Sequence, residues 1–155
     1  MKRRVFLMTT GAALIATPLH AATCSFEICR SDSEWRARLS KNEFLVLREE
    51  ETERPYTSPL NDETRAGLYH CRGCDLPVYS ADAKYDSETG WPSFFESLPN
   101  AIGTKEDRKF LFQVRTEVHC RRCGSHLGHV FDDGPEPTGK RHCLNGLSLA
   151  FNPAA

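Results

Sequence analysis

The stretch CRRCGSHLGHVF at residues 120–131 contains the pattern that decides the fold of this chain. Its Cys120-x-x-Cys123 pair repeats a Cys71-x-x-Cys74 pair, and 45 residues separate the two. A CxxC turn lets two thiolates converge on one ion, and two such turns complete a tetrahedral four-sulfur site. The sequence therefore predicts one structural Zn²⁺ bound by Cys71, Cys74, Cys120 and Cys123, with no position left for water.

Two other interpretations of the paired cysteines stay open. Each pair has the spacing of a thioredoxin-like redox motif, and each has the spacing of a local disulfide. A redox CxxC motif normally occurs once, at the start of a helix, whereas both pairs here lie in segments of β character. Zinc is soft enough for sulfur ligands and has no redox chemistry of its own, so the structural metal site is the favoured interpretation.

Alternation of apolar and polar side chains predicts strands in the second half of the chain. Residues 109–119 alternate in this way and predict one strand, and residues 147–151 repeat the pattern near the end. Residues 31–50 instead indicate helix, because Ser31 and Ser40 each begin a capping box. Residues 51–65 predict a loop with one helical turn. We expect a mainly β (α+β) fold with two antiparallel sheets and short N-terminal helices.

Composition places the chain in the ordinary globular class. Of its 155 residues, 39% are hydrophobic and 26% are charged, which excludes collagen-like and largely disordered proteins. The formal net charge of −1 provides no basic field for a nucleic acid. No linker or low-complexity run interrupts the sequence, so residues 23–155 are expected to form a single domain.

Residues 1–22 have the layout of an export signal. Arg3 and Arg4 precede an apolar stretch and then small residues, which resembles a twin-arginine signal peptide. An uncleaved membrane anchor is disfavoured because the apolar stretch, 5–19, is shorter than the roughly 20 residues of a spanning helix. A lipid-modified Cys24 is a weaker alternative. We expect an exported, periplasmic protein with no membrane association after cleavage.

A reactive thiol is expected at Cys143. Residues 132–139 are rich in turn formers, and a hairpin centred on residue 136 places His129 directly opposite Cys143, with Asn145 on the same face. A neighbouring cation raises the thiolate fraction of a cysteine, and Arg141 adds to that effect. The alternative is an inert core thiol beside a hydrogen-bonded strand histidine.

The segment GWPSFF at residues 90–95 gathers three aromatic side chains around a glycine and a proline. Trp91, held by the proline after it, is expected to line a binding surface. Phe94 is a second candidate for that surface, and the alternative for Phe94 and Phe95 is a place in the core.

Together these segments resemble the B-type methionine sulfoxide reductases. The matching stretches are residues 52–55, 58–61, both CxxC pairs, 85–87, 90–94, 123–135 and 141–145. The resemblance covers most of residues 34–151. It implies two antiparallel sheets after short helices, a structural zinc, and reduction of the R epimer of methionine sulfoxide, one enzyme serving each epimer.

The resemblance also implies roles for individual residues. Cys143 would attack the sulfoxide sulfur and become a sulfenic acid, and His129, with His126 nearby, would position and protonate the oxygen. Asn145 would help to fix the site. Trp91 would wall the pocket for the methyl group, with Phe94 and Arg141 as further substrate-binding candidates.

Three positions depart from the family pattern. Thr89 stands where many members have a resolving cysteine, and His142 and Gly146 replace the more usual aromatic residue and serine. Cys29, or else Cys24, is therefore the candidate resolving residue. Direct reduction of the sulfenic acid by an external thiol is the alternative.

The expected partners are oxidised proteins or peptides as substrates and a thioredoxin-like reductant, and the protein is expected to be a monomer. The rival hypothesis is a non-catalytic, zinc-bound β module that binds a partner through its aromatic surface. The two differ at Cys143, which only an enzyme would need.

Overall fold

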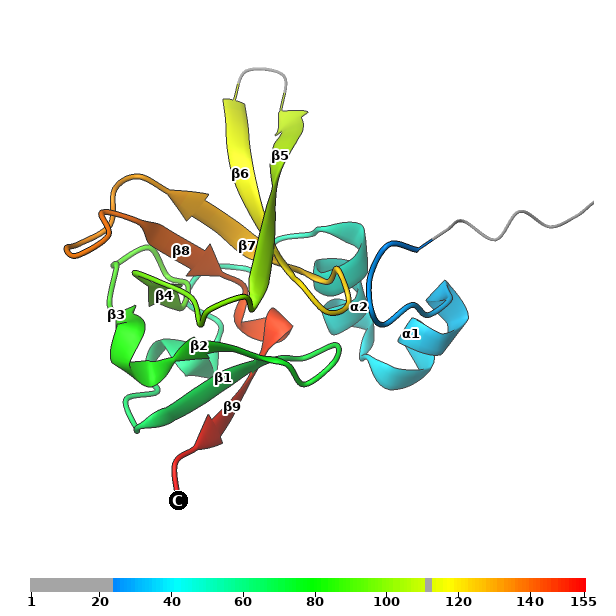
Figure 1. Ribbon diagram of the computed structural model, residues 1–155, viewed down its shortest axis with the longest axis horizontal. Helices are drawn as coiled ribbons and strands as arrows, with labels where there is room; N and C mark the ends of the chain where they lie inside the picture. The colour runs from blue at the N-terminus through cyan, green and yellow to red at the C-terminus, as the bar shows by residue number, and fades with distance from the viewer. Residues whose placement is uncertain (1–23, 111–112) are drawn as a thin grey trace, which may run out of the picture.

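The computed structural model describes residues 24–110 and 113–155. The expected export signal at residues 1–22 lies outside the described residues. Two antiparallel sheets form the body of the described chain, and two short helices pack beside them (Figure 1). The predicted mainly β architecture with helices at the N-terminal side is confirmed.

The smaller sheet has three strands in the order β2-β1-β9. These are β1 (Gly67–Cys71), β2 (Pro77–Ser80) and β9 (Leu149–Pro153). The larger sheet has the order β3-β4-β8-β7-β6-β5. Its strands are β3 (Lys84–Tyr85), β4 (Ser93–Phe94), β5 (Ile102–Phe110), β6 (Gln113–Cys120), β7 (His126–Phe131) and β8 (Arg141–Leu144).

Both predicted capping boxes begin helices. Helix α1 (Asp32–Arg38) starts after Ser31, and helix α2 (Lys41–Glu49) starts after Ser40. In each case the serine hydroxyl accepts from the backbone N–H three residues on, and the glutamate there accepts from the serine N–H. These contacts satisfy N–H groups that a helix start otherwise leaves unpaired. Three short 3₁₀ turns complete the helical elements: η1 (Pro59–Asn61), as predicted within 51–65, η2 (Ala81–Ala83) and η3 (Gly146–Ser148).

The predicted strand at 109–119 is wrong in one respect. The segment belongs to two strands, because β5 ends at Phe110 and β6 begins at Gln113, and these two residues face each other across the hairpin. Figure 1 shows this hairpin projecting from the body of the molecule. Alternation continues through the tip, and no glycine or proline marks it, so the pattern alone did not reveal the turn.

Aromatic side chains fill the space between the two sheets. Phe94 on β4 is fully buried, and its ring lies 4.9 Å from that of Tyr69 and 4.6 Å from that of Tyr79 on the smaller sheet. The structure therefore places Phe94 in the core, which is the alternative that the sequence left open, and not on a substrate-binding surface. Edge-on and tilted ring contacts of this kind stabilise the packing of the two sheets.

No helix among residues 24–110 and 113–155 combines the length and apolar character needed to cross a membrane.

Candidate active site and metal centre

The hairpin of β7 and β8 has the predicted register. His129 faces Cys143, and the flanking pairs are Val130 with His142 and Phe131 with Arg141. Residues opposite each other in an antiparallel pair point to the same face of the sheet. The imidazole and the thiol therefore open onto one side, as the turn-rich segment 132–139 indicated.

A pocket of about 110 Å³ opens at this face. Its lining consists of Thr52, Trp91, Arg115, Gly128, His129, Phe131, Cys143, Leu144 and Asn145. Four of the predicted site residues (Cys143, His129, Asn145 and Trp91) thus come together. A larger cavity of about 560 Å³ lies between α2 and the loop at residues 51–57, and Thr52 lines both spaces.

The thiol of Cys143 is partly buried. Burial raises its pKa, and the contacts that lower it are Thr89, the positive charge of Arg141 and Ser93, which together do not offset burial. Thr89 Oγ1 lies 3.9 Å from the sulfur. The thiol thus keeps its proton at neutral pH in the free protein.

His129 is neutral and is held by a carboxylate. Burial lowers the pKa of its ring, more than the hydrogen bond to Asp107 raises it. Its Nε2 lies 2.8 Å from Asp107 Oδ2. Burial alone would raise the pKa of Asp107, but the Lys109 backbone N–H, His129 and Arg115 hold it well below its usual range. Since Asp107 is ionised, Nε2 carries the hydrogen, and Nδ1 is the acceptor of the ring.

His126 lies behind His129 and does not line the pocket. It is 2% exposed, and the two rings are 5.3 Å apart. Its Nδ1 lies 3.1 Å from Glu117 Oε1, and Glu117 also pairs with Lys105 at 2.9 Å. Burial raises the pKa of Glu117, but the hydrogen bonds and charges of His126 and Lys105 lower it by more. The pKa of Glu117 therefore lies below its usual value. His126 therefore packs against His129 from a buried position beside the Glu117 carboxylate.

Asn145 and Trp91 are tied to one loop by backbone contacts. The Asn145 side chain accepts from the Glu53 N–H at 2.8 Å and donates to the Leu127 carbonyl at 3.2 Å. Trp91 Nε1 donates to the Glu53 carbonyl at 2.9 Å. Asn145 thus bridges β7 and the loop that carries Thr52, and the same loop holds the indole. The role of Asn145 in fixing the site stays a prediction.

Arg141 does not line the pocket. Its guanidinium makes a two-pronged contact with Asp133, both distances being 2.8 Å, and it lies 4.4 Å from the centre of the Phe131 ring. The substrate contact expected of Arg141 stays a prediction. Its positive charge nevertheless acts on Cys143, two residues away on the same strand.

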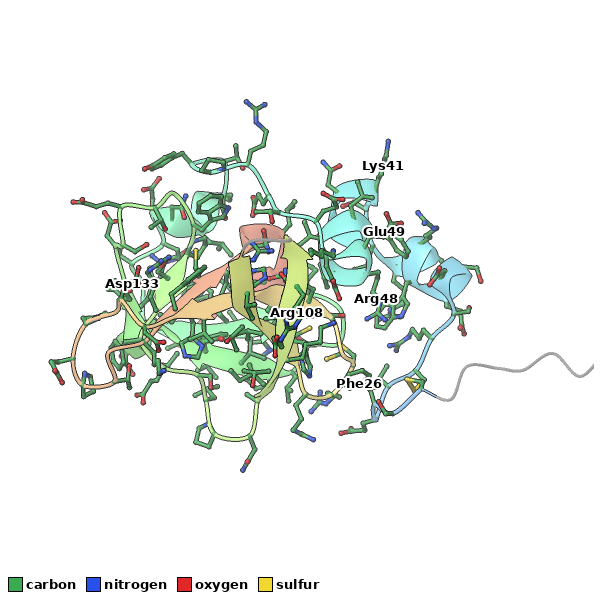
Figure 2. All side chains as sticks on the ribbon, turned by 90° about the horizontal axis from the view of Figure 1, so that it is seen from above. Phe26, Lys41, Arg48, Glu49, Arg108 and Asp133 are labelled. Carbon is green, nitrogen blue, oxygen red and sulfur yellow. A yellow bond between two sulfur atoms is a disulfide. The ribbon has the colours of Figure 1, made fainter. Side chains whose placement is uncertain are left out.

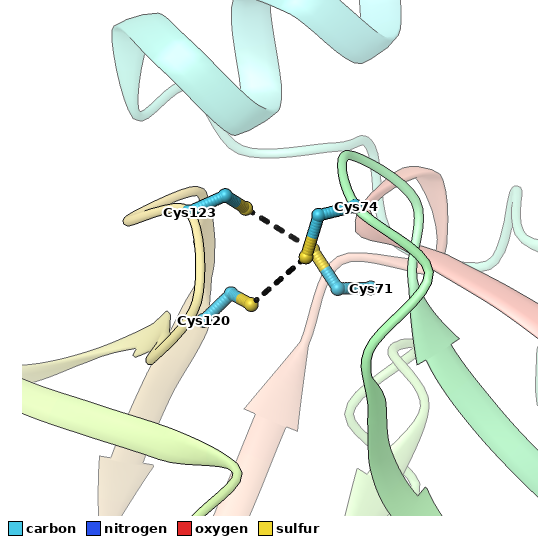
Figure 3. Close-up of side chains that lie close together, drawn as sticks. All are labelled: Cys71, Cys74, Cys120 and Cys123. Carbon is cyan, nitrogen blue, oxygen red and sulfur yellow. Dashed lines mark hydrogen bonds between the residues drawn. The ribbon is translucent and has the colours of Figure 1, made fainter. Parts of the chain in front are cut away.

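The four paired cysteines converge as predicted (Figure 3). Their sulfur atoms all lie within 4.8 Å of one another. Cys71 and Cys123 are 3.7 Å apart, and Cys74 and Cys120 are 3.5 Å apart. Metal–sulfur bonds of about 2.3 Å in a tetrahedron require sulfur atoms about 3.8 Å apart. The residues therefore fit one tetrahedral metal ion, and neither a disulfide nor a single redox pair describes the cluster.

The two CxxC turns share one backbone geometry. In each, the N–H after the second cysteine donates to the carbonyl of the first: Asp75 to Cys71 at 2.8 Å, and Gly124 to Cys120 at 2.9 Å. The donor residue is left-handed in both turns, with φ of 61° at Asp75 and 67° at Gly124. Aspartate tolerates this conformation better than most residues do. Gly73 is needed for space instead, because a Cβ there would lie 2.8 Å from Ser125 Oγ.

The remaining two cysteines are bonded to each other. Cys24 and Cys29 form a disulfide. The segment between them packs on the second CxxC turn, where Ile28 N–H donates to the Arg122 carbonyl at 2.9 Å. Figure 2 shows Asp133, the partner of Arg141, at the left of the molecule, and Phe26 of this segment well away from it, below the helices. The structure does not bring Cys29 or Cys24 to Cys143, so their expected role as resolving thiols has no geometric support.

Asp107, Arg115, Glu117 and Glu53 are the site residues that the sequence did not reveal. The first three lie in the β5–β6 hairpin, where charged residues alternating with apolar ones indicate a solvated face. Asp107 and Arg115 are directly opposite each other in the β5–β6 hairpin, and opposite charges at such positions would have indicated their contact. That pairing could not be derived from the sequence, because the alternating pattern did not show the turn between the two strands.

Comparison with known proteins agrees with this site. The SelR domain matches residues 39–153. A peptide methionine sulfoxide reductase MsrB from Agrobacterium fabrum is 46% identical over 127 residues, covering 82% of this chain and 94% of that protein. A protein of the same name from Thiobacillus denitrificans is 50% identical over 125 residues, covering 80% of this chain and 94% of its own. A third protein of this name, from Leifsonia xyli subsp. xyli, is 47% identical over 137 residues, which cover 87% of this chain and 98% of that protein.

Proposed function

The chain belongs to the B-type peptide methionine sulfoxide reductases and reduces the R epimer of methionine sulfoxide, and we propose that Cys143 is the residue that takes the oxygen. One observation carries this proposal. Of the seven cysteines, four form the metal cluster and two form a disulfide, so Cys143 is the remaining thiol, and it lies in the pocket with His129 and Trp91.

The reaction balances with the groups present. Attack of the Cys143 sulfur on the sulfoxide sulfur forms a sulfur–sulfur bond. That bond and the sulfur–oxygen bond of the substrate then break as the oxygen passes to the Cys143 sulfur. The thiol gives Cys–SOH and the substrate leaves as a thioether, so Cys143 is oxidised by two electrons and the methionine sulfur is reduced by two. Nδ1 of His129 is the acceptor for the thiol proton and returns it to the departing oxygen, while Asp107 holds the ring in that tautomer.

The pocket has an apolar wall beside this polar group. Trp91, Phe131 and Leu144 line it together with His129. A substrate with its oxygen toward the imidazole and its methyl group against that wall must direct the rest of its chain toward the larger neighbouring cavity. The opposite epimer cannot satisfy these three constraints at once. We assign selection of the R epimer to this arrangement. The larger neighbouring cavity leaves room for the residues that flank an oxidised methionine in a polypeptide.

The reductant acts directly on the sulfenic acid in this proposal. Thr89 replaces the usual resolving cysteine, and Cys24 and Cys29 are paired with each other away from Cys143. An external thiol, such as that of a thioredoxin-like protein, condenses with Cys–SOH to give a mixed disulfide and water. A second thiol of the reductant then releases Cys143 as a thiol.

Zinc is the ion we assign to the tetracysteine cluster. Residues Cys71, Cys74, Cys120 and Cys123 would hold it, and four sulfur ligands leave no open position. The ion would contribute to the stability of the fold and take no part in the reaction, which occurs at a separate pocket.

Export to the periplasm remains part of the proposal. Its support is the twin-arginine pattern at residues 1–22 and the Cys24–Cys29 disulfide, since disulfides persist in oxidising compartments. A twin-arginine route exports folded protein, so the four metal ligands would leave the cytoplasm already occupied. We further propose that the exported protein is a monomer, which light scattering of the purified chain would test.

The deciding experiment is turnover of the separated R and S sulfoxides by the mature protein with dithiothreitol. We expect turnover of the R epimer, and its loss in Cys143→Ser with the metal content and circular dichroism retained. Full activity of Cys143→Ser would overturn the assignment of Cys143. A protein without turnover of either epimer would support the rival hypothesis of a binding module.

A further inference from the structure

Three hydroxyl groups form a chain that ends at the sulfur of Cys143. Ser93 Oγ lies 2.7 Å from Ser87 Oγ, and Ser87 Oγ lies 2.8 Å from Thr89 Oγ1. Thr89 Oγ1 is 3.9 Å from Cys143 Sγ. At the other end, Ser93 Oγ lies 3.1 Å from the carbonyl oxygen of Trp91. The hydroxyls thus connect the thiol with a backbone acceptor beside the same pocket.

The sheet fixes the buried end of this chain. Ser93 is 1% exposed, and it faces Cys143 directly in the pairing of β4 with β8. Ser87 and Thr89 are partly buried in the loop between β3 and β4. The Gly90 carbonyl of that loop accepts from the Tyr56 N–H at 2.7 Å and from the Asn61 side chain at 3.1 Å. The hydroxyls are therefore held in place by contacts on both sides.

The hydrogen bonds along this chain of hydroxyls can run in either of two directions. A hydroxyl has one proton to donate and two lone pairs to accept with. When Cys143 is a thiol, its S–H donates to Thr89, Thr89 to Ser87, Ser87 to Ser93, and Ser93 to the Trp91 carbonyl. When Cys143 is a thiolate, the three bonds between the sulfur and the hydroxyls reverse: Thr89 donates to the sulfur, Ser87 to Thr89, and Ser93 to Ser87. The Trp91 carbonyl, which can only accept, then loses the Ser93 proton. Only the protons turn, and no heavy atom has to move.

We propose that Thr89, Ser87 and Ser93 form a reversible hydroxyl chain that stabilises the Cys143 thiolate as it attacks the substrate. Thr89 and Ser93, which both face the reacting sulfur, are then catalytic residues, and Ser87 is a positioning residue that acts through them. The inference rests on the proposed role of Cys143. It assigns a function to the residue that replaces the resolving cysteine of other family members.

The charged and titratable groups around the sulfur do not by themselves stabilise the Cys143 thiolate enough to offset burial. The titratable side chains around Cys143 are Arg141 on β8, His129 on β7, Arg115 on β6 and Tyr85 on β3. Arg141 pairs with Asp133 and also lowers the pKa of the thiol by its charge and a side-chain hydrogen bond, but Thr89 acts on that pKa more strongly. Arg115 pairs with Asp107, and His129 is neutral. Because burial raises the pKa of the thiol, a chain of oriented donors offsets part of that cost, and bonds in such a chain strengthen one another.

The test is the pH profile of Cys143 alkylation by iodoacetamide, followed by mass spectrometry of the Cys143 peptide. In Thr89→Val, which keeps the shape and removes the hydroxyl, we expect the apparent pKa to rise by about one unit. Alkylation near neutral pH then slows about tenfold, while the alkaline plateau is unchanged. Thr89→Ser keeps a hydroxyl and restores the wild-type profile. Thr104→Val, an exposed threonine on β5, is the matched control and leaves the profile unchanged.

Ser87→Ala is the second variant for the same alkylation experiment. It leaves Thr89 in contact with the sulfur but removes the donor behind it, so we expect a smaller shift in the same direction. A Thr89→Val profile that superimposes on that of the wild type overturns the inference. If Thr89→Val fails to fold, an unchanged Ser87→Ala profile overturns it instead.

The same samples separate this inference from the proposed function. Wild-type turnover of the R sulfoxide combined with an unshifted Thr89→Val profile overturns the hydroxyl chain alone. A shifted profile in a protein without turnover supports the chain and overturns the function.

Discussion

At the residue scale, the chemistry of this protein depends on ionisation states that burial sets. Burial raises the pKa of Cys143 and lowers that of His129, so the resting pair is a thiol facing a neutral imidazole. A neutral ring with Nε2–H bound to an ionised Asp107 has its acceptor nitrogen available for the thiol proton. In the proposed reaction the pair would therefore exchange one proton during attack, and a permanent thiolate–imidazolium pair is not required.

Replacing Asp107 by asparagine tests this arrangement. The amide keeps the shape but donates as well as accepts, so it no longer enforces one tautomer of His129. We expect kcat to fall about 100-fold with a much smaller change in KM, and the pH–rate profile to shift. Asp132→Asn, at an exposed residue that pairs with Lys140, is the control and keeps wild-type kinetics. Equal kcat in Asp107→Asn and wild type would contradict the assigned tautomer.

His142 provides a second prediction, on stability. Burial lowers the pKa of His142 from 6.5 to about 4, and its Nδ1 lies 3.0 Å from the Tyr79 hydroxyl. The folded state thus favours the neutral ring. Its contribution is fully present above pH 6.5 and is lost as the pH falls from 6.5 to about 4, because the unfolded chain binds the proton first.

We expect His142→Phe to remove that part of the acid sensitivity. The free energy of unfolding, measured by urea titration at several pH values, should fall less steeply between pH 6.5 and 4 than in the wild type. The difference should be of the order of 1–2 kcal/mol after allowance for solvent screening. Parallel curves for the two proteins would show that His142 titrates alike in the folded and unfolded states.

At the element scale, helix α2 connects the site loop with the metal centre. It packs on β7 and η3, and Phe44, Val46 and Leu47 are buried there. Near its N-terminus, Glu43 pairs with Arg72 of the first CxxC turn at 3.3 Å. Near its C-terminus, Arg48 reaches the Cys123 carbonyl of the second turn at 3.3 Å. The helix thus holds both cysteine turns by side chains at its two ends.

Loss of the Ser40 cap should weaken this connection. In Ser40→Ala the Glu43 N–H loses its acceptor, so we expect about 1 kcal/mol of destabilisation and a melting temperature lower by about 3–6 °C. Lys41→Gln, at an exposed position in the first turn of α2, is the control and should change stability by less than about 0.5 kcal/mol. Equal melting temperatures for Ser40→Ala and Lys41→Gln would mean that the cap does not stabilise α2.

At the scale of the whole molecule, the tetracysteine cluster joins the two sheets. Cys71 ends β1 and Cys74 lies in the turn to β2 of the smaller sheet, whereas Cys120 ends β6 and Cys123 lies in the turn to β7 of the larger sheet. A metal ion at this position crosslinks the ends of two hairpins from different sheets. None of the four cysteines lines the pocket of Cys143, so a metal ion would act on that pocket only through the fold.

Removal of the metal should therefore unfold the protein as a unit. We expect one zinc per chain by elemental analysis. A strong chelator, or Cys71→Ser, should lower the melting temperature by at least about 10 °C, with loss of turnover following loss of structure. A metal-free protein that melts like the wild type would show that the four cysteines stabilise the fold without an ion.

The sequence by itself determined the features that depend on spacing along the chain. The CxxC pairs, the two capping boxes and the hairpin centred on residue 136 are local patterns, and each appears in the structure where it was predicted. Local patterns succeed because a few neighbouring residues set the turn, the cap or the register.

Only the tertiary structure decided which groups meet from distant parts of the chain. It placed Phe94 in the core, turned Arg141 toward Asp133 and paired Cys24 with Cys29 away from Cys143. It also brought Asp107 to His129 and Thr89 to the thiol. The position of a side chain in such contacts depends on how whole strands pack, and burial then sets its charge, so neither follows from the order of residues alone.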